Sequence, residues 1–450
     1  MAAQVRGRRI SPLELIDAHL NRIGHKNPSI NAFSHLFAEQ AREQARQAAD
    51  RPAEGPLHGV PITIKDSFDI AGVPTRSGSR LRGDDEAIED ATAVAKLRRA
   101  GAILLGKTNV PELAGSYETD NYITGCTVNP WDETRTPGGS SGGEAAAIAS
   151  GCSPGGLGSD GGGSIRVPAH FCGIAGFKPT VRRISGAGHF PPCVGPAALV
   201  SAPGPMARSV ADLRLLFELM QGADNRDSLA IPPPAATAAL PVRIGLLRQF
   251  YQIPVHAAAN QALDHAATLL AQSGFPVEEI QLRGLERAPN VWSFFFGELG
   301  RMHTRQFLAG RESEAHWTLL EFYKNTPAPD AAAVYAHYAE RERLRAAALE
   351  QMAGYPILLM PPCSIPAFKH GERRHAIGEA SIGQFAAMAL ATTWNLLGFP
   401  ALVLPCGRTG EGLPVGVQIV GRPFEDELVL EAGERLEKER GAFPYPPETS

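Results

Sequence analysis

The sequence has few cysteines for its length, and none of them form a recognisable pair. It contains 450 residues and six cysteines, with no Cys-x-x-Cys spacing and no Cys/His cluster at zinc-binding intervals. A chain of this size needs no disulfides to hold a core. We therefore expect reduced, mostly buried thiols, and neither a metal nor another cofactor.

Long apolar runs and concentrated basic charge are also missing. No stretch approaches ~18 consecutive apolar residues, and the N-terminus lacks the apolar run of a signal peptide. The net charge is −4, and the densest basic stretches, 6–9 and 96–99, are only four residues long. A nucleic-acid-binding protein would present a basic face. We expect a cytoplasmic monomer or homodimer that binds neither a membrane nor a nucleic acid.

The chain does contain alternating helical and strand patterns. Two helices are expected within 11–50, and a short alternating strand at 60–64 ends at Lys65. A helix near 90–100 then precedes a buried strand at 102–105. This strand–helix–strand order is typical of a mixed α/β sheet.

A Pro/Ala-rich stretch, 231–240, has the composition of a connector. Strand patterns occur on both sides of it, so a single sheet crossing the connector is more economical than two domains. After the connector we expect strands at 243–247, 277–280, 357–360, 401–404 and 415–420, and helices at 259–274, within 290–353 (a long one near 330–352) and at 425–438.

The segment 137–168 is unusually rich in glycine and serine, which make up 17 of its 32 residues. Such a composition is typical of a flexible linker. Against that interpretation, an apolar helix is expected at 144–149, and the apolar residues Ile165 and Val167 follow the glycines. We interpret the segment as part of a folded site.

Three consecutive glycines, 161–163, immediately precede Ser164. Without Cβ atoms, they allow several backbone N–H groups to converge on one point. A serine after such a turn would have its Oγ beside a developing oxyanion, as a hydrolase of unactivated amides requires. We predict Ser164 as a nucleophile.

Glycine-rich loops also bind phosphate, but neither glycine run precedes the Gly-Lys-[Ser/Thr] of a P-loop. The stretch 101–108 has the P-loop spacing, yet its four middle residues are apolar and predict a strand. Pro111 also argues against a helix that begins at Lys107. The sequence therefore disfavours phosphate binding.

A base for Ser164 is harder to identify, because the Gly/Ser-rich segment contains no histidine. His58, His170 and His189 flank the motifs, and each suits a structural or rim position better. Lys65 could serve if burial lowered its pKa by roughly 3 units from ~10.4, which costs ~4 kcal/mol. A surface Lys65 paired with Asp66 fits the pattern equally well.

Six short sequence motifs (words), which follow one another along the chain, resemble those of the amidase signature enzymes. The resemblance runs from about residue 10 to the C-terminal helix, and 75 positions separate Lys65 from Ser140 while 24 separate Ser140 from Ser164, both typical of the family. The words are Gly-Val-Pro-Ile-Thr-Ile-Lys-Asp (59–66), Gly-Lys-Thr-Asn-Val-Pro-Glu (106–112), Thr-Val-Asn-Pro-Trp-Asp (127–132), Pro-Gly-Gly-Ser-Ser-Gly-Gly (137–143), Ser-Asp-Gly-Gly-Gly-Ser-Ile-Arg-Val-Pro (159–168) and Gly-Leu-Pro-Val-Gly-Val-Gln (412–418).

The resemblance implies an α/β fold with a large mixed, mostly parallel β-sheet core surrounded by helices. It implies a single amidase domain over 1–450. Within it we expect a catalytic core at 57–210, a variable, helix-rich substrate entrance at 225–355, and a C-terminal α/β part of the same sheet at 356–450.

The resemblance also assigns catalytic roles. It makes Ser164 the acylated nucleophile, Ser140 a bridging serine associated with a cis peptide, and Lys65 the base. Ser141, Asp160 and Arg166 look like supporting residues, with Arg166 anchoring the loop through Asp160; simply holding the glycine turn together is equally consistent. The backbone N–H groups expected to form the oxyanion hole are those of Gly161, Gly162, Gly163 and Ser164.

Substrate preference is less clear from the sequence. The loop residues that resemble the family's acyl pocket are Ala114, Gly115, Ser116 and Tyr117, and the aromatic residues of 290–353 suit either an apolar entrance or helix core. We predict a neutral, partly apolar or aryl amide as the small-molecule partner, with ester and carbamate (urethane) side activity. One alternative is an amidase subunit of a glutamine-dependent tRNA amidotransferase, but the segment near 114–124 lacks the sequence associated with that subfamily. A second alternative is a non-catalytic binding protein, which is disfavoured because all three catalytic positions hold the expected residues.

Overall fold

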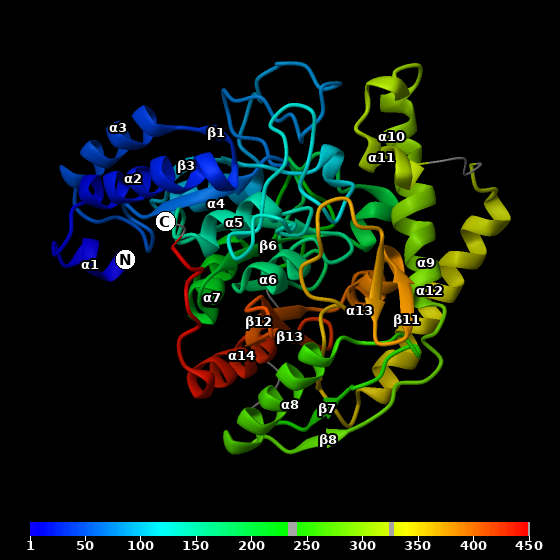
Figure 1. Ribbon diagram of the computed structural model, residues 1–450. Helices are drawn as coiled ribbons and strands as arrows, with labels where there is room; N and C mark the ends of the chain where they lie inside the picture. Colours follow the sequence, from blue (N-terminus) through cyan, green and yellow to red (C-terminus); the bar gives the residue numbers. More distant parts are fainter. Residues whose placement is uncertain (233–240, 324–327, 449–450) are drawn as a thin grey trace.

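A single mixed sheet forms the centre of the molecule (Figure 1). The computed structural model describes residues 1–232, 241–323 and 328–448. Over these residues, 11 strands form the sheet in the order β1-β3-β2-β4-β6-β5-β12-β13-β9-β7-β8. The strands are β1 (Phe33–Leu36), β2 (Pro61–Lys65), β3 (Ile103–Thr108), β4 (Gly155–Asp160), β5 (Ala175–Lys178), β6 (Ala202–Ala207), β7 (Ile244–Leu246), β8 (Val277–Glu279), β9 (Ile357–Met360), β12 (Ala401–Arg408) and β13 (Pro414–Gly421).

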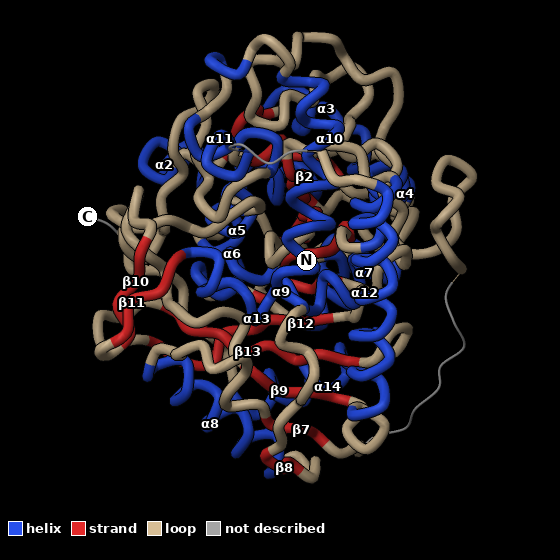
Figure 2. The backbone as a smooth tube through the Cα atoms, turned by 90° about the vertical axis from the view of Figure 1, so that its right-hand side faces the viewer, coloured by secondary structure: helices blue, strands red, loops and turns tan. Residues whose placement is uncertain are grey.

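Helices surround the sheet, as expected, and Figure 2 shows the strands stacked through the molecule between them. A separate hairpin consists of β10 (Arg374–Ile377) and β11 (Ala380–Gly383). The helices are α1 (Ala2–Arg6), α2 (Pro12–Ile30), α3 (Ala38–Ala49), α4 (Thr92–Arg99), α5 (Gly142–Ala149), α6 (Arg166–Cys172), α7 (Val210–Met220), α8 (Ala257–Gln272), α9 (Ala288–Trp292), α10 (Gly300–Leu308), α11 (Trp317–Tyr323), α12 (Ala331–Gln351), α13 (Gln384–Leu397) and α14 (Asp426–Arg440), with a π-helix at Ser293–Leu299 and 3₁₀ turns at Glu112–Ala114, Gly195–Leu199 and Glu312–Glu314.

The strand directions correct one part of the expected fold. The sheet is mixed but not mostly parallel: among its described strands, six neighbouring pairs are antiparallel and four are parallel. The linker 409–413 between β12 and β13 is too short for the crossover that parallel neighbours need, so these strands form a hairpin. Parallel pairing is confined to β3-β2-β4 and β9-β7-β8.

Both halves of the chain contribute to this sheet. β12 pairs with β5, so the strands before and after the Pro/Ala-rich stretch are hydrogen-bonded to one another. This supports the proposal of one domain, although its bounds stay predictions. Most of the predicted connector, 233–240, lies outside the described residues.

Two strands near the site differ from the predicted pattern. The region 11–50 contains β1 between its two expected helices, and β4 lies inside the Gly/Ser-rich segment. β4 is not recognisable by its apolar residues because glycine is needed for close approach. A Cβ at Gly156 would lie 2.2 Å from the carbonyl oxygen of Thr63 on β2.

Helices α5 and α6 carry the Gly/Ser-rich segment into the interior. All residues of both helices are buried, and the two helices contact each other. Four others, α4, α7, α8 and α14, contribute to the largest apolar cluster together with β2, β12 and β13. The interior position of α5 and α6 holds the segment rigidly, which excludes a flexible linker.

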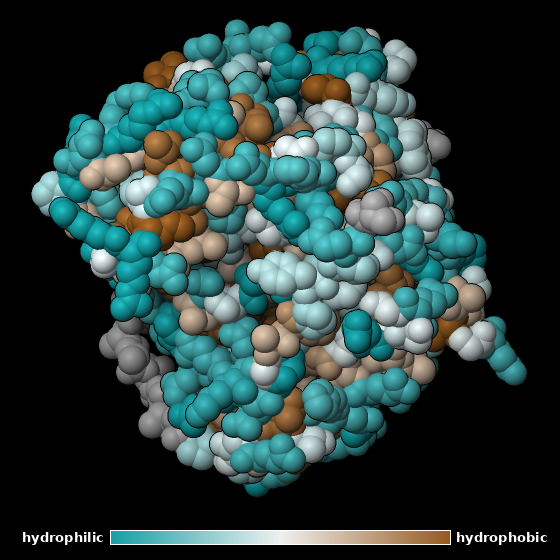
Figure 3. Space-filling view, turned by 60° about the vertical axis from the view of Figure 1, so that its left-hand side comes forward, coloured by the Kyte–Doolittle hydropathy of each residue, from teal (hydrophilic) through white to brown (hydrophobic). Residues whose placement is uncertain are grey.

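The exterior is mostly polar on the face seen in Figure 3, where hydrophobic side chains occur in small groups. No helix in the described ranges is long and apolar enough to cross a bilayer.

Candidate active site

The parallel strands β2 and β4 bring Lys65 and Ser159 together. Lys65 is the last residue of β2, and Ile64 is in register with Leu157 of β4, so the two strand ends lie side by side. Ser140 lies two residues before the start of α5, and Ser164 lies two residues before α6. The sheet and two buried helices thus converge on one point.

Lys65 is fully buried and contacts two serines. Its Nζ lies 2.7 Å from Ser140 Oγ, 3.0 Å from Ser159 Oγ and 3.4 Å from the Ser159 carbonyl oxygen. Burial lowers the pKa of Lys65 to about 7 and outweighs the opposing effect of more distant acidic groups. An amine in this setting can accept a proton near neutral pH.

The alternative pairing of Lys65 with Asp66 is wrong. Asp66 instead lies 2.7 Å from the Nζ of Lys107, and both of these side chains are buried. Asp66 follows the last residue of β2, and its side chain faces Lys107, whereas that of Lys65 faces Ser140. Lys107 therefore provides the counter-charge for Asp66 and leaves Lys65 to the serines.

Ser140 and Ser141 form the link between the two serine-containing words. The Gly139–Ser140 peptide bond is cis, as the resemblance implied. Ser141 donates its backbone N–H to the Ser164 carbonyl oxygen (3.1 Å), and its hydroxyl contacts the backbone of Ser159 at 3.3 and 3.4 Å. Ser141 thus fastens the start of α5 to both β4 and the glycine turn.

Asp160 and Arg166 form a buried ion pair inside the glycine turn. Arg166 Nε and Nη2 each donate to an Asp160 carboxylate oxygen at 3.0 Å, and both side chains are fully buried. Burial alone would raise the pKa of Asp160, but the Arg166 guanidinium outweighs it and holds that pKa below its usual range. Asp160 also accepts from the backbone N–H groups of Gly163 (2.7 Å) and Ile165 (3.0 Å). The predicted Arg166–Asp160 contact is confirmed.

Two residues distant in the sequence complete this network. Gln418, the last residue of the sixth family word, accepts from Arg166 Nη1 at 2.6 Å. Asn395, from α13, hydrogen-bonds Arg166 and donates to Asp160 Oδ1 at 2.9 Å. Asn395 belongs to none of the words, so no local pattern distinguishes it from other helical residues.

The predicted oxyanion donors differ in their availability. The N–H of Gly163 is already donated to Asp160, because the carboxylate lies inside the turn, so this residue departs from the prediction. Within the described part of the chain, the N–H groups of Gly161, Gly162 and Ser164 donate to no protein acceptor. These three remain candidate donors.

Two aromatic side chains donate hydrogen bonds to carbonyl oxygens of the glycine turn. Trp292 Nε1 donates to the Gly161 carbonyl oxygen (2.7 Å), and the Tyr117 hydroxyl donates to the Gly162 carbonyl oxygen (2.8 Å). In a trans peptide the N–H opposes the C=O, so the first bond turns the Gly162 N–H away from Trp292. Glycine is required here, because a Cβ at Gly162 would lie 2.3 Å from Trp292.

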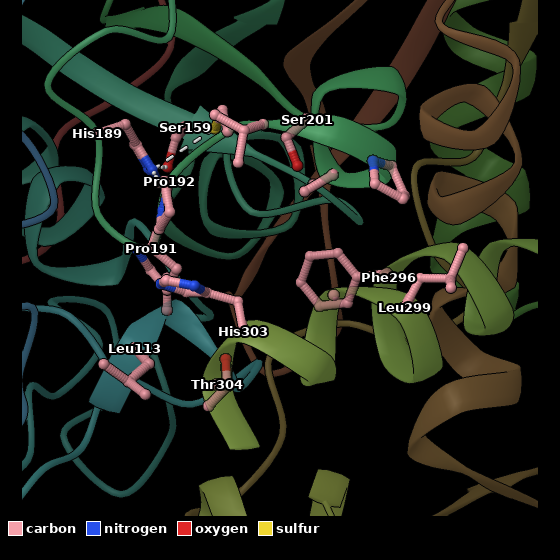
Figure 4. Close-up of a pocket in the computed structure, with 18 of the residues that line it drawn as sticks. Leu113, Ser159, His189, Pro191, Pro192, Ser201, Phe296, Leu299, His303 and Thr304 are labelled. Atoms are coloured by element: carbon pink, nitrogen blue, oxygen red, sulfur yellow. Dashed lines mark hydrogen bonds between the residues drawn. The ribbon is translucent and has the colours of Figure 1, made fainter. Parts of the chain in front are cut away.

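A cavity of about 350 Å³ adjoins the glycine turn, and Figure 4 shows residues that line it. Ser140, Ser159, Gly161 and Ser164 are among its lining residues. Most of the remaining lining is apolar, and among the side chains that the structure describes none of the lining residues is Arg, Lys or Glu; the one acid, Asp160, is paired with Arg166. The walls include Leu113, Pro191, Pro192, Phe296, Leu299 and Met302, with His189, Ser201, His303 and Thr304 as polar members.

The predicted pocket loop is partly corrected. Ala114 and Gly115 line the cavity, but Ser116 and Tyr117 do not. Tyr117 is buried against an apolar cluster that includes Val167, and its hydroxyl is used by Gly162. Tyr117 supports the glycine turn instead of forming a wall.

The aromatic residues of 290–353 serve both predicted purposes. Trp292, Phe294 and Phe295 are buried in an apolar cluster, whereas Phe296 lines the cavity. Phe296 stacks on Trp292 with ring centroids 5.0 Å apart. Trp317 is partly exposed, and the side chains of Phe322 and Tyr323 lie outside the described part of the structure.

The three flanking histidines also differ in their surroundings. His58 bonds the Ala48 carbonyl oxygen, and His170 is held between two backbone groups, so both are structural, as expected. His189 lines the cavity and lies 2.9 Å from Ser159 Oγ. In the described ranges, no group of three or more His, Cys, Asp or Glu side chains could hold a metal ion.

Comparisons with known proteins agree with this arrangement. The amidase family model matches residues 14–430. The chain is 35% identical, over 95% of its length and 93% of the relative, to a glutamyl-tRNA(Gln) amidotransferase subunit of Chloroflexus aggregans. It is 34% identical, over 99% of its length and 86% of the relative, to indoleacetamide hydrolase of Bradyrhizobium diazoefficiens.

A solved amidase structure matches over 98% of this chain and 99% of that chain, with a TM-score of 0.88 and 31% sequence identity. The family expected from the six words is thereby confirmed. The chain belongs to the amidase family and is an enzyme that acts on carbon–nitrogen bonds other than peptide bonds.

Proposed function

We propose that this amidase hydrolyses a neutral amide through an acyl-enzyme on Ser164, with Ser140 as the proton relay and Lys65 as the base. The observation that carries the proposal is the 2.7 Å contact between Lys65 Nζ and Ser140 Oγ, at the floor of a cavity that Ser164 also lines. A hydroxyl can accept one proton while it donates another, so Ser140 suits a relay.

The relay accounts for each proton. As Ser164 Oγ attacks the carbonyl carbon, its proton passes to Ser140 Oγ, and the proton of Ser140 passes to Lys65 Nζ. The path then reverses and protonates the leaving nitrogen, so that the C–N bond breaks and the amine departs. Water attacks the acyl-enzyme by the same route, which releases the carboxylic acid and restores Ser164.

The developing oxyanion would be stabilised by the backbone N–H groups of Gly161, Gly162 and Ser164. The turn that carries them is held by Asp160 on one side and Trp292 on the other. Donors that are already in place cost no reorganisation when charge develops on the carbonyl oxygen.

The cavity supports a neutral, partly apolar or aryl amide as substrate. A charged substrate would lose hydration on entry, and the described side chains of the lining offer no unpaired charge to compensate. Phe296, Leu299 and Leu113 instead provide apolar surface for an aryl or aliphatic group. Esters and carbamates of similar shape are proposed side substrates, because the same acyl-serine chemistry accepts their carbonyl groups.

A substrate panel tests this proposal. Anilides, aliphatic amides, aryl carbamates and free glutamine are assayed, and the acyl-enzyme is sought on Ser164 by mass spectrometry after rapid quenching. Ser164→Ala should abolish turnover and labelling by a fluorophosphonate, whereas Ser313→Ala, at an exposed serine of the turn Glu312–Glu314, should keep both. Turnover of only a charged or dicarboxylic amide would refute the substrate class, and an unlabelled Ser164 would favour a non-catalytic binding protein.

A second candidate is the amidase subunit of a glutamine-dependent tRNA amidotransferase. The identity to the Chloroflexus aggregans protein favours it. The described lining of the cavity does not, because free glutamine has an ammonium and a carboxylate that both need partners and these side chains offer no unpaired charge. Glutaminase activity that appears only after partner subunits are added would select this candidate over the first.

A further inference from the structure

Ser159 has no role in the proposed relay, yet its hydroxyl lies between two groups of the site. Its Oγ is 3.0 Å from Lys65 Nζ. It is also 2.9 Å from His189 Nε2, and Figure 4 shows these two side chains side by side. His189 continues the chain to the backbone, since its Nδ1 lies 2.7 Å from the Pro191 carbonyl oxygen. The four groups form one hydrogen-bonded line that ends at the base.

The direction of each hydrogen bond in this line follows from the group at its end, the Pro191 carbonyl oxygen. The Pro191 carbonyl can only accept, so Nδ1 of His189 must carry the proton. Burial lowers the pKa of His189 to about 4, so the ring is neutral at pH 7 and its Nε2 is an acceptor. The hydroxyl of Ser159 must therefore donate to His189, and its lone pairs face Lys65.

This direction determines which way the lone pair of Lys65 points. A neutral lysine has two N–H groups and one lone pair. The N–H groups are directed to acceptors on Ser159, namely Oγ and the carbonyl oxygen at 3.4 Å. Among the residues that the structure describes, the remaining neighbour within hydrogen-bond distance is Ser140, so the lone pair faces the Ser140 hydroxyl at 2.7 Å.

We propose that His189 is a positioning residue that locks the Ser159 hydroxyl as an acceptor for Lys65 and so reserves the lysine lone pair for Ser140. Without an acceptor at position 189, the Ser159 hydroxyl can rotate and donate to the same lone pair. Lys65 is then occupied and cannot take the proton of Ser140. The inference rests on the proposed function, because it refines the relay through Ser140.

The surroundings of His189 fix its ring in this orientation. Phe68 packs against it edge to face, with ring centroids 4.9 Å apart. Cys193 Sγ lies 3.6 Å from Nδ1, and burial raises the pKa of that thiol to about 12, so it remains neutral. Lys65 is thus the charged or titrating group that His189 faces at neutral pH.

A double-mutant cycle tests the inference. The variants are His189→Phe, Ser159→Ala and the combination of both, assayed for kcat and KM with a neutral anilide. His189→Phe should lower kcat about tenfold when Ser159 is present and have almost no effect on kcat in the Ser159→Ala background, because no hydroxyl remains to compete. KM should change little, and His189→Gln should recover most of kcat, since its side-chain carbonyl can accept from Ser159.

A structural role for His189 predicts a different result. Loss of packing alone would lower kcat by equal factors in both backgrounds, and this outcome, or a failure of His189→Gln to recover activity, overturns the inference. Thermal unfolding of each variant is measured beside kcat, and His189→Leu replaces His189→Phe in the cycle if the phenylalanine unfolds the protein. An unlabelled Ser164 in the wild-type enzyme would instead overturn the proposed function.

Discussion

The Nζ of Lys65 lies 2.7 Å from the Oγ of Ser140, and the two residues are 75 positions apart in the chain. The proposed role of this contact in proton transfer depends on the burial of Lys65 as much as on the distance. Burial holds the pKa of Lys65 at about 7, so the amine can be neutral when it faces the hydroxyl. The following expectations depend on this pair and on the turn that faces it.

Removing the amine should affect amides more than esters. Lys65→Ala deletes both the base and the source of the proton for the leaving nitrogen, whereas an alkoxide leaving group needs that proton less. We expect kcat/KM for an amide to fall by at least about a hundredfold and for the matching ester by clearly less. Lys438→Ala, at an exposed lysine of α14, is the control. Equal losses for both substrates would exclude Lys65 as the proton source.

Activity should rise with pH around neutrality. Only neutral Lys65 accepts a proton, and its pKa is lowered to about 7, so kcat/KM for a neutral amide should be half-maximal near that pH. One pH unit below, kcat/KM should be about a tenth of the plateau that it reaches well above this pH. The rate profile between pH 5.5 and 9 checks this. A flat profile across that range would contradict a lysine base.

Stability should depend on the same lysine with a definite sign. Below pH 7 Lys65 is protonated in both the folded and the unfolded protein, so its charge is buried on folding. Above pH 7 the folded protein binds fewer protons than the unfolded one. The free energy of unfolding therefore rises with pH until the ordinary lysine pKa of 10.5 is reached. Lys65→Met should therefore stabilise the protein at pH 6 by about 2 kcal/mol, and this stabilisation should be lost at pH 9, because the wild-type protein gains about 1.4 kcal/mol for each pH unit between 7 and 10.5. Urea unfolding at both pH values measures this, with Lys438→Met as the control. A destabilised variant at pH 6 would argue against a buried, uncompensated charge.

Tyr117 should support catalysis without touching substrate. Tyr117→Phe removes the bond to the Gly162 carbonyl oxygen and leaves a buried acceptor unpaired, at a cost of about 1–3 kcal/mol. We expect a lower kcat, an unchanged KM and a lower melting temperature. Steady-state kinetics with two amides of different size distinguish this from a pocket wall, for which KM would change with substrate size.

Much of the site could be predicted from the sequence because its central residues lie in short, ordered words. Those words supply the residues that the structure brings together around the glycine turn, namely Lys65, Ser140, Ser164, Asp160 and Arg166. Their partners outside the words could not be predicted. Asn395 and Trp292 come from helices whose sequences only indicate apolar packing, and their contacts with Asp160 and Gly161 exist only once α13 and α9 have packed.

The errors in the predicted fold have similar causes. Strand direction depends on how distant segments pair, so the excess of antiparallel neighbours could not be seen in local patterns. The strand β4 escaped detection because three of its six residues are glycine, a residue that usually disfavours strands. The cytoplasmic location and the monomeric or homodimeric state stay predictions of the sequence.

The stacked pair Phe296 and Trp292 joins the substrate cavity to the glycine turn. Phe296 forms part of the cavity wall, and the indole behind it holds the Gly161 carbonyl. A substrate that displaced Phe296 would therefore also shift Trp292 and the Gly161–Gly162 peptide, which orients a candidate oxyanion donor. We therefore expect that grafting the segment 288–299 from another amidase would alter kcat as well as the range of accepted substrates.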